Sequence, residues 1–133
     1  MILVDSSVWV CYYRADGDAK IRQIVIDAID KDLVAINGII IVEILSGISR
    51  KKEFEKVRGD FMGFHILPVQ DEVFLKAAVM GSKLRRKGVT VPSTDLIIAA
   101  SAINSKSILY HIDNHFDMIA EHIDLKVRNL SKL

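Results

Sequence analysis

The sequence has few of the residues that mark secreted, membrane-spanning or disordered proteins. Its single cysteine, Cys11, cannot form an intramolecular disulfide, which fits a reducing cytoplasm. Two prolines and seven glycines are too few for a low-complexity chain. The longest apolar stretch, residues 38–48, is interrupted by Glu43 and has about half the length of a membrane span. No basic segment precedes the short apolar run at the N-terminus. We expect a soluble, cytoplasmic protein without a signal peptide or membrane partner.

The sequence also lacks a large net charge, because its 18 basic residues nearly balance its 17 acidic residues and leave a formal charge of +1. Any nucleic-acid contact must therefore come from a local patch. The densest basic cluster contains Lys83, Arg85, Arg86 and Lys87, and a second one spans residues 50–52. Either cluster could bind phosphates, or could be a solvated helix end that the helix dipole favours.

The apolar residues fall into short continuous runs that alternate with amphipathic segments. Half of the 133 residues are apolar, enough for the core of one domain covering residues 1–133. Alternation of this kind predicts an α/β fold with three layers, α/β/α, and a central parallel sheet. We predict strands at residues 2–4, 33–36, 64–69, 108–112 and 125–127. We predict a helical turn capped by Ser6 or Ser7, a helix capped by Asn37 that runs to about residue 48, and helices at residues 19–30, 50–61, 71–87, 95–105 and 116–121.

Three acidic residues are predicted at the edge where parallel sheets bind ligands. Asp5 and Asp113 directly follow predicted strands, and Asp95 opens a helix, which predicts a strand-to-helix edge for it as well. Each acid alone has a structural explanation, because Asp5 and Asp95 could cap helices and Asp113 could begin a turn. Together they predict an acidic rim.

Glu43 is the acid with the most unusual surroundings. Its segment, residues 39–45, is otherwise entirely apolar, which predicts a helix buried on all sides. A buried carboxylate must be paired or must bind a metal. Glu43 could instead bridge to a lysine or arginine, or lie on a solvent-exposed edge. Four acids at one rim would repel one another without a cation, and an all-oxygen site suits Mg²⁺ or Mn²⁺.

Four sequence blocks in order are similar to those of a known family. The chain resembles the PIN-domain ribonucleases, in particular the VapC-type toxins of bacterial and archaeal toxin–antitoxin pairs. The sequence departs from many members at Asn114 and His115, where they have a basic or hydroxyl residue. The blocks that carry the resemblance are Ile2–Trp9, Val42–Gly47, Thr94–Ala100 and Asp113–Asp117.

The resemblance implies an endoribonuclease that hydrolyses phosphodiester bonds with metal-activated water. It implies that Asp5, Glu43, Asp95 and Asp113 are the catalytic, metal-binding acids, with Asp117 as a fifth carboxylate. It also implies a hydroxyl from Ser6 or Ser7 beside the metal, where it would contact the substrate. A VapB-like antitoxin and self-association, as a homodimer, are implied as partners.

Other classes of function fit the sequence less well. A receiver-type phosphoryl-transfer domain also has acids at strand ends, but requires neighbouring acids after the first strand, where Asp5 is followed by Ser6 and Ser7. A non-catalytic binding module with a decayed site is disfavoured because all four acids are present. A zinc site from His111, His115 and His122 lacks a recognised ligand spacing.

Overall fold

Five short apolar segments form a parallel sheet in the order β3-β2-β1-β4-β5. The computed structural model describes residues 1–133. All five predicted strands are present, each shifted by no more than a few residues. The central strand β1 is buried between β2 and β4, which explains its continuous apolar sequence. The strands are β1 Ile2–Val4, β2 Val34–Asn37, β3 His65–Leu67, β4 Ile108–His111 and β5 Val127–Asn129.

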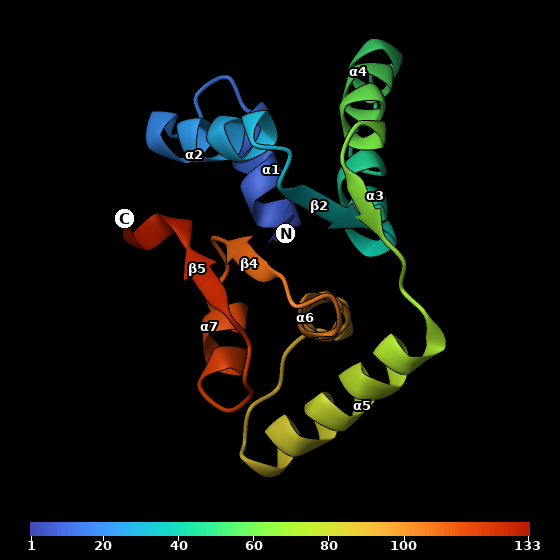
Figure 1. The fold of residues 1–133 in the computed structure, drawn as a ribbon, viewed down its shortest axis with the longest axis vertical. Helices are drawn as coiled ribbons and strands as arrows, with labels where there is room; N and C mark the ends of the chain where they lie inside the picture. The colour runs from blue at the N-terminus through green and yellow to red at the C-terminus, as the bar shows by residue number, and fades with distance from the viewer.

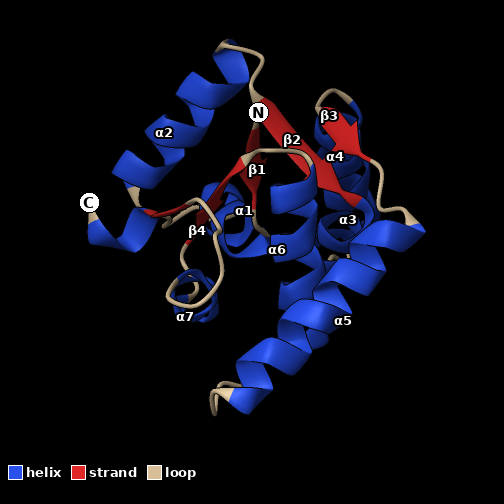
Figure 2. Ribbon diagram, turned by 60° about the horizontal axis from the view of Figure 1, so that its bottom comes forward, coloured by secondary structure: helices blue, strands red, loops and turns tan.

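Seven α-helices cover the sheet on both faces, so the prediction of a three-layer α/β/α fold is confirmed. Figure 1 shows α1, α2 and α4 toward one side of the sheet, the upper side in this view, α5 to α7 toward the other, and α3 beside β2. Right-handed crossovers explain this division, since the chain moves from β1 toward β3 on one face and returns toward β5 on the other. Figure 2 shows the strands between these helices. The helices are α1 Ser6–Tyr13, α2 Ala19–Asp30, α3 Gly38–Leu45, α4 Lys51–Met62, α5 Asp71–Arg86, α6 Ser93–Asn104 and α7 Asn114–Ala120, followed by the 3₁₀ turn η1 Leu130–Lys132.

Trp9 anchors α1 against the upper layer. Its side chain is fully buried, and its indole N–H donates a hydrogen bond to the Val4 carbonyl at 3.0 Å. The rings of Phe64 and Tyr13 stack on it, with centroids at 5.2 and 6.0 Å. Because Val4 ends β1, this contact fixes the direction in which the chain leaves the central strand.

The prediction that α3 is buried on all sides is wrong. The helix buries Ile40, Ile44 and Leu45, but Val42 is 64% exposed and Glu43 is also exposed. Only one stripe of a short helix can face the sheet, so an almost entirely apolar sequence leaves apolar side chains on the surface. Glu43 therefore lies on the open side of α3.

Helix α6 reaches the sheet by a route that differs from the prediction. It begins at Ser93 and follows α5 through a loop, so Asp95 lies in the first turn of a helix that no strand precedes. Gly81 of α5 permits close packing against α6, because a Cβ atom there would lie 2.8 Å from Leu96 Cδ1. This packing sets the position of Asp95, the residue before Leu96. None of the helices combines the length and apolar character needed to cross a membrane.

Candidate active site

The carboxyl ends of β1 and β4 meet where the order of strands reverses. The chain adds β2 and β3 on one side of β1 and places β4 and β5 on the other. Ligand sites of open parallel sheets lie at such switch points. Asp5 follows β1 directly, and Asp113 lies two residues after the end of β4. The fold thus places both carboxylates at one edge.

Asp5 is held in place by the helix that it caps. Its Oδ2 accepts hydrogen bonds from the Ser7 backbone N–H at 3.1 Å and from Ser7 Oγ at 2.6 Å. The N-cap of α1 is therefore Asp5, and not Ser6 or Ser7. The same Ser7 Oγ accepts a hydrogen bond from the Ile112 N–H at 3.1 Å, which joins α1 to the end of β4. Ser7 thus links the backbone beside Asp113 to the carboxylate of Asp5.

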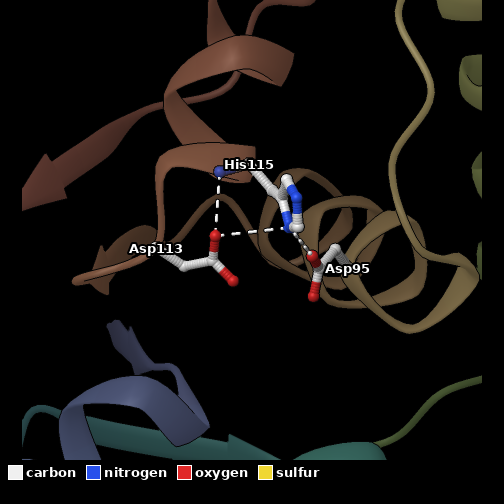
Figure 3. Close-up of side chains that lie close together, drawn as sticks. All are labelled: Asp95, Asp113 and His115. Atoms are coloured by element: carbon white, nitrogen blue, oxygen red, sulfur yellow. Dashed lines mark hydrogen bonds and ion pairs between the residues drawn. The ribbon is translucent and has the colours of Figure 1, made fainter.

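Asp113, His115 and Asp95 form a compact group (Figure 3). Asp113 caps α7, and its Oδ1 accepts a hydrogen bond from the His115 N–H at 2.9 Å. The ring Nδ1 of His115 lies 2.9 Å from Asp95 Oδ2 and 3.3 Å from Asp113 Oδ1. One ligand atom from each residue lies within 4.8 Å of the others, a spacing that a metal ion could bridge.

Glu43 joins the rim from α3. Asn37 caps this helix by accepting a hydrogen bond from the Ile40 N–H at 3.1 Å, which directs α3 away from the end of β2. Ser6 Oγ donates a hydrogen bond to Glu43 Oε1 at 3.0 Å. The alternative of a salt bridge from Glu43 to a lysine or arginine is not observed.

The four acids are close enough for their charges to interact. The pKa of Asp95 is raised to about 6, mainly by burial and further by the charges of Asp113 and Asp5. A hydrogen bond from His115 lowers the pKa and offsets part of this rise. Burial also raises the pKa of Asp5, to which Asp113 contributes. Although Glu43 as a whole is exposed, partial burial of its carboxyl group raises its pKa, and the charges of Asp5 and Asp113 add to this rise. An acidic cluster of this kind favours a bound proton or a cation.

Each acid of the rim keeps one carboxylate oxygen without a hydrogen bond in the protein. Capping or hydroxyl contacts occupy Asp5 Oδ2, Asp113 Oδ1 and Glu43 Oε1, and His115 occupies Asp95 Oδ2. The hydrogen bonds that these acids make within the protein therefore leave one oxygen of each carboxylate free to bind a cation. Carboxylate oxygens are the ligands that Mg²⁺ and Mn²⁺ prefer, and the ligand atoms that lie close enough to share one ion belong to Asp95, Asp113 and His115.

The PIN domain family matches residues 2–122, almost the whole of the α/β/α fold and all four acids. The chain belongs to the PIN domain family. Within that family, it is 34% identical to the VapC ribonuclease Mb1587 of Mycobacterium bovis and to ribonuclease VapC11 of Mycobacterium tuberculosis. Each comparison covers 95% of this chain and 96% of the relative. The resemblance to VapC-type proteins that the sequence blocks indicated is thereby confirmed.

Solved structures with the same PIN fold support this assignment of architecture. FitAcB from Neisseria gonorrhoeae superposes with a TM-score of 0.82 at 22% identity, covering 100% of both chains. VapBC2 from Rickettsia felis, solved bound to a DNA fragment from its promoter, gives a TM-score of 0.77 at 20% identity, covering 97% of this chain and 98% of that one.

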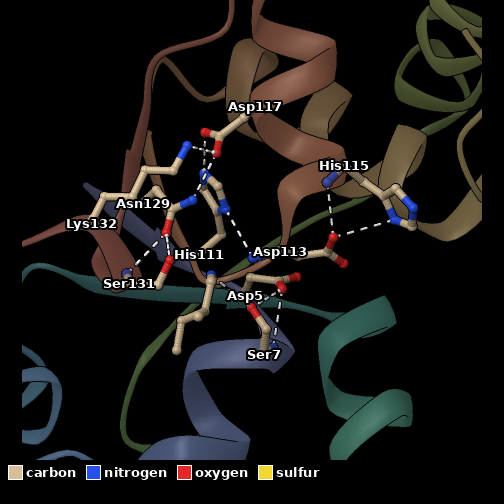
Figure 4. Close-up of polar contacts among 10 residues, drawn as sticks. Asp5, Ser7, His111, Asp113, His115, Asp117, Asn129, Ser131 and Lys132 are labelled. Atoms are coloured by element: carbon tan, nitrogen blue, oxygen red, sulfur yellow. Dashed lines mark hydrogen bonds and ion pairs between the residues drawn. The ribbon is translucent and has the colours of Figure 1, made fainter.

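Asp117 lies apart from the rim of this PIN domain. Figure 4 shows its carboxylate turned away from Asp5 and Asp113, toward the C-terminal segment. Asn129 Nδ2 and Lys132 Nζ lie 2.7 and 3.2 Å from Asp117 Oδ2. Burial opposes ionisation of Asp117, but these contacts outweigh it and hold its pKa below the ordinary value. The geometry gives the hypothesis of a fifth metal-binding carboxylate no support.

His115 is the rim residue that sequence reasoning missed. The sequence suggests it only as part of a zinc site with His111 and His122, and the structure does not bring these three together as a metal group. The available signal was its position two residues after Asp113. His115 therefore lies in the first turn of the helix that Asp113 caps, where its ring can contact the Asp113 carboxylate.

The basic cluster at the end of α5 is exposed, and its members point to different places. Arg85 lines a hollow between α5 and the start of α6, together with Thr90 and Ser93. Arg86 lines a separate shallow hollow, and its Nη1 donates a hydrogen bond to Ser82 Oγ at 2.9 Å. Lys83 is exposed on the same helix.

Proposed function

We propose that this PIN domain is a Mg²⁺- or Mn²⁺-dependent endoribonuclease, the toxin of a VapBC-type toxin–antitoxin module. The observation that carries the proposal is the rim of four acids, each with one unpaired oxygen, in a chain whose relatives are named VapC ribonucleases. Asp5, Glu43, Asp95 and Asp113 would be the metal ligands, and the His115 ring would either contribute Nδ1 or orient Asp95 and Asp113.

The protein's own residues would prepare this site in three ways. Ser7 and the capping bonds fix the carboxylates before a cation arrives, which lowers the ordering cost of binding. The hydrogen bond from Ser6 orients Glu43, an exposed side chain that would otherwise be free to rotate. Bound Mg²⁺ or Mn²⁺ would supply an activated water and stabilise charge on the phosphate. In this arrangement Ser6 and Ser7 act on the acids, and a direct contact with substrate is not required.

The RNA would reach the rim along the hollow between α5 and α6. Arg85, Thr90 and Ser93 line this hollow, and Asp95 lies in the same helical turn as Ser93. A guanidinium beside an acidic site offsets the repulsion of an incoming phosphate. We therefore assign phosphate binding to Arg85 ahead of Arg86 and Lys83.

The antitoxin would bind an apolar groove that begins at Glu43. The groove is lined mainly by apolar side chains of α1, α3 and α4, including Val10, Tyr13 and Ile44, with Arg14, Glu43 and Glu53 at its polar positions. This lining suits an amphipathic segment. Solved relatives of this fold include VapBC and FitAB complexes, which supports a protein partner of the antitoxin type.

Self-association as a homodimer would use a different surface. Helix α5 exposes an apolar stripe, in which Phe74, Leu75 and Val79 are 45, 69 and 67% exposed. Contiguous apolar patches of this kind mark interaction sites. The stripe belongs to the lower helix layer, whereas the groove belongs to the upper one, so both surfaces could be occupied at once.

The direct test is cleavage of total RNA by the purified chain with Mn²⁺ or Mg²⁺ and with EDTA. We expect cleavage with either metal, none with EDTA, and none from Asp5→Asn. Asp124→Asn is the matched control, because Asp124 is exposed and its side chain makes no hydrogen bond or salt bridge. Equal cleavage by Asp5→Asn and the wild type at saturating Mn²⁺ would refute the assigned metal site, and a complete lack of cleavage would favour a non-catalytic binding module.

The two interaction surfaces can be separated with a crossed pair of variants. Val10→Glu should abolish binding of the antitoxin, taken as the product of the neighbouring gene, and leave the oligomeric state unchanged. Leu75→Glu should convert a dimer to a monomer in light scattering and leave antitoxin binding unchanged. Each variant is the control for the other, and loss of both properties in one variant would refute the assignment of separate surfaces.

A further inference from the structure

The candidate site is connected to the end of the chain through a buried histidine. His111, the last residue of β4, is completely buried, and its ring packs on Phe116 with centroids 5.3 Å apart. Its Nδ1 accepts a hydrogen bond from the Asp113 backbone N–H at 3.1 Å. A nitrogen that accepts carries no proton, so the proton of the neutral ring is on Nε2.

The other ring nitrogen of His111 faces Asp117. Nε2 lies 3.3 Å from Asp117 Oδ1, but the alignment falls outside hydrogen-bond geometry, so the contact is electrostatic. Asp117 Oδ2 is bound by Asn129 of β5 and Lys132 of η1. Asn129 in turn accepts hydrogen bonds from the Ser131 N–H and hydroxyl. Figure 4 shows this network running from Lys132 to Asp113.

The hydrogen bond from the Asp113 N–H to His111 lies where the chain leaves β4, so it affects the position of Asp113 at the rim. β4 ends at His111, and the next two backbone N–H groups are bound by side chains: Ile112 N–H by Ser7 Oγ and Asp113 N–H by His111 Nδ1. These two bonds determine how the chain turns from β4 into α7. They therefore determine where the Asp113 carboxylate stands relative to Asp95 and His115.

We propose that His111 is a positioning residue for Asp113, and that the C-terminal segment fixes the His111 ring through Asp117. The proposal rests on the proposed function only in so far as Asp113 is a metal ligand. It also gives Asp117 a role that does not require contact with the metal. Groups that orient metal ligands commonly change metal affinity about 10–100-fold when they are removed.

The experiment separates the two nitrogens of the ring. In His111→Asn the side-chain carbonyl can replace Nδ1 as the acceptor for Asp113 N–H, while the contact with Asp117 is lost. In His111→Gln the amide can reach toward Asp117, but the acceptor beside Asp113 is lost. His65→Asn is the matched control, since His65 is a partly exposed histidine of the edge strand β3 that contacts Asp32. The dissociation constant for Mn²⁺ is measured by calorimetry, without RNA.

We expect affinity for Mn²⁺ to fall about tenfold or more in His111→Gln, to fall by a smaller factor in His111→Asn, which keeps the acceptor for Asp113 N–H but loses the contact with Asp117, and to be unchanged in His65→Asn. Equal losses in His111→Asn and His111→Gln would mean that the ring acts only by packing, and unchanged affinity in both would mean that it does not position Asp113. Either result would overturn the proposal.

Two further readouts do not depend on metal, and the first of them needs no variant. Long-range ¹H–¹⁵N spectra of the wild type should show His111 as the neutral Nε2–H tautomer, and a proton on Nδ1 would overturn the proposal. The Asp113 amide should exchange with solvent faster in His111→Gln than in His111→Asn, and equal exchange would overturn it. If the wild type binds no Mn²⁺, the proposed metal site fails, while the tautomer and the exchange rates still decide the role of His111.

Discussion

Replacing Asp95 by asparagine should stabilise the metal-free protein, and the stability of the variant should then change little when metal is added. Asp95 is buried, with an exposed fraction of 8%, and its pKa is raised from 3.8 to about 6. Each unit of pKa corresponds to about 1.4 kcal/mol, so ionised Asp95 costs the folded state roughly 3 kcal/mol at neutral pH. Asparagine keeps the size of the side chain and removes the charge that causes this cost.

The expected gain is about equal to the net cost of ionisation. The pKa of about 6 already includes the hydrogen bond from His115 to Asp95, which is 2.9 Å long, so the loss of this contact in the Asp95→Asn variant is not counted a second time. We therefore expect the variant to be more stable by roughly 3 kcal/mol in EDTA at pH 7.5, a rise in Tm of about 10 °C for a domain of this size.

The stability difference should depend on pH in a defined direction. Because the folded pKa of Asp95 is raised, the folded state binds its proton more tightly than the unfolded chain does. Below the unfolded value of 3.8 both states are protonated and Asp95 costs nothing. The cost grows between pH 3.8 and about 6 and is constant above that range. The difference in Tm should therefore be smaller at pH 4.5 than at pH 7.5.

Metal should reverse the order of stability. A ligand that binds only the folded state at about 1,000 times its Kd adds about 4.1 kcal/mol. Mn²⁺ should therefore raise the Tm of the wild type to that of Asp95→Asn or above, and should change the variant little. Thermal unfolding followed by circular dichroism, with and without Mn²⁺, checks this, with Asp124→Asn as control. Equal stabilisation of both proteins by Mn²⁺, or no gain in EDTA, would refute the argument.

Three further outcomes are expected. Arg85→Ala should weaken RNA binding several-fold and reduce its salt dependence, whereas Arg86→Ala should change both little; equal effects in filter binding would contradict the assigned RNA path. His115→Ala should lower affinity for Mn²⁺ more than for Mg²⁺, because an imidazole ligand favours Mn²⁺; calorimetry with both ions would expose an equal loss. The apparent Kd for Mn²⁺ should rise as pH falls below about 6, since the pKa of Asp95 is raised to about 6 and protons then compete for the same oxygens; a flat profile from pH 7 to 5 would contradict this.

The sequence was informative wherever a local pattern determines the structure. Ile2, Leu3 and Val4 form an apolar run that only a strand buried on both faces accommodates, and Asp5 ends it. The spacing of strands and helices was sufficient for the parallel sheet, and the sheet then directs Asp5 and Asp113 to one edge. Asn37 was correctly predicted to cap α3. Its side chain accepts a hydrogen bond from the Ile40 N–H, which is only three residues away, so the interaction is local in sequence.

Long-range packing decided the remaining features. Glu43 lies in an almost wholly apolar helix, yet it is exposed, because the angle at which α3 meets the sheet selects the stripe that is buried. Asp95 reaches the rim although no strand precedes it, since Gly81 allows α5 and α6 to pack closely. Asp117 belongs to the same sequence block as Asp113, but Asn129 and Lys132 draw it toward the C-terminal segment.

The sequence by itself determined the order of the strands and helices along the chain, the α/β class and the placement of Asp5 and Asp113 at the carboxyl edge. These features follow from hydrophobic periodicity and capping, which act over a few residues. Only the tertiary structure decided that His115 lies between Asp95 and Asp113, and that His111 connects Asp113 to Asp117. Such contacts depend on angles and distances between packed elements, and a few ångströms of displacement, invisible in any local pattern, would separate them.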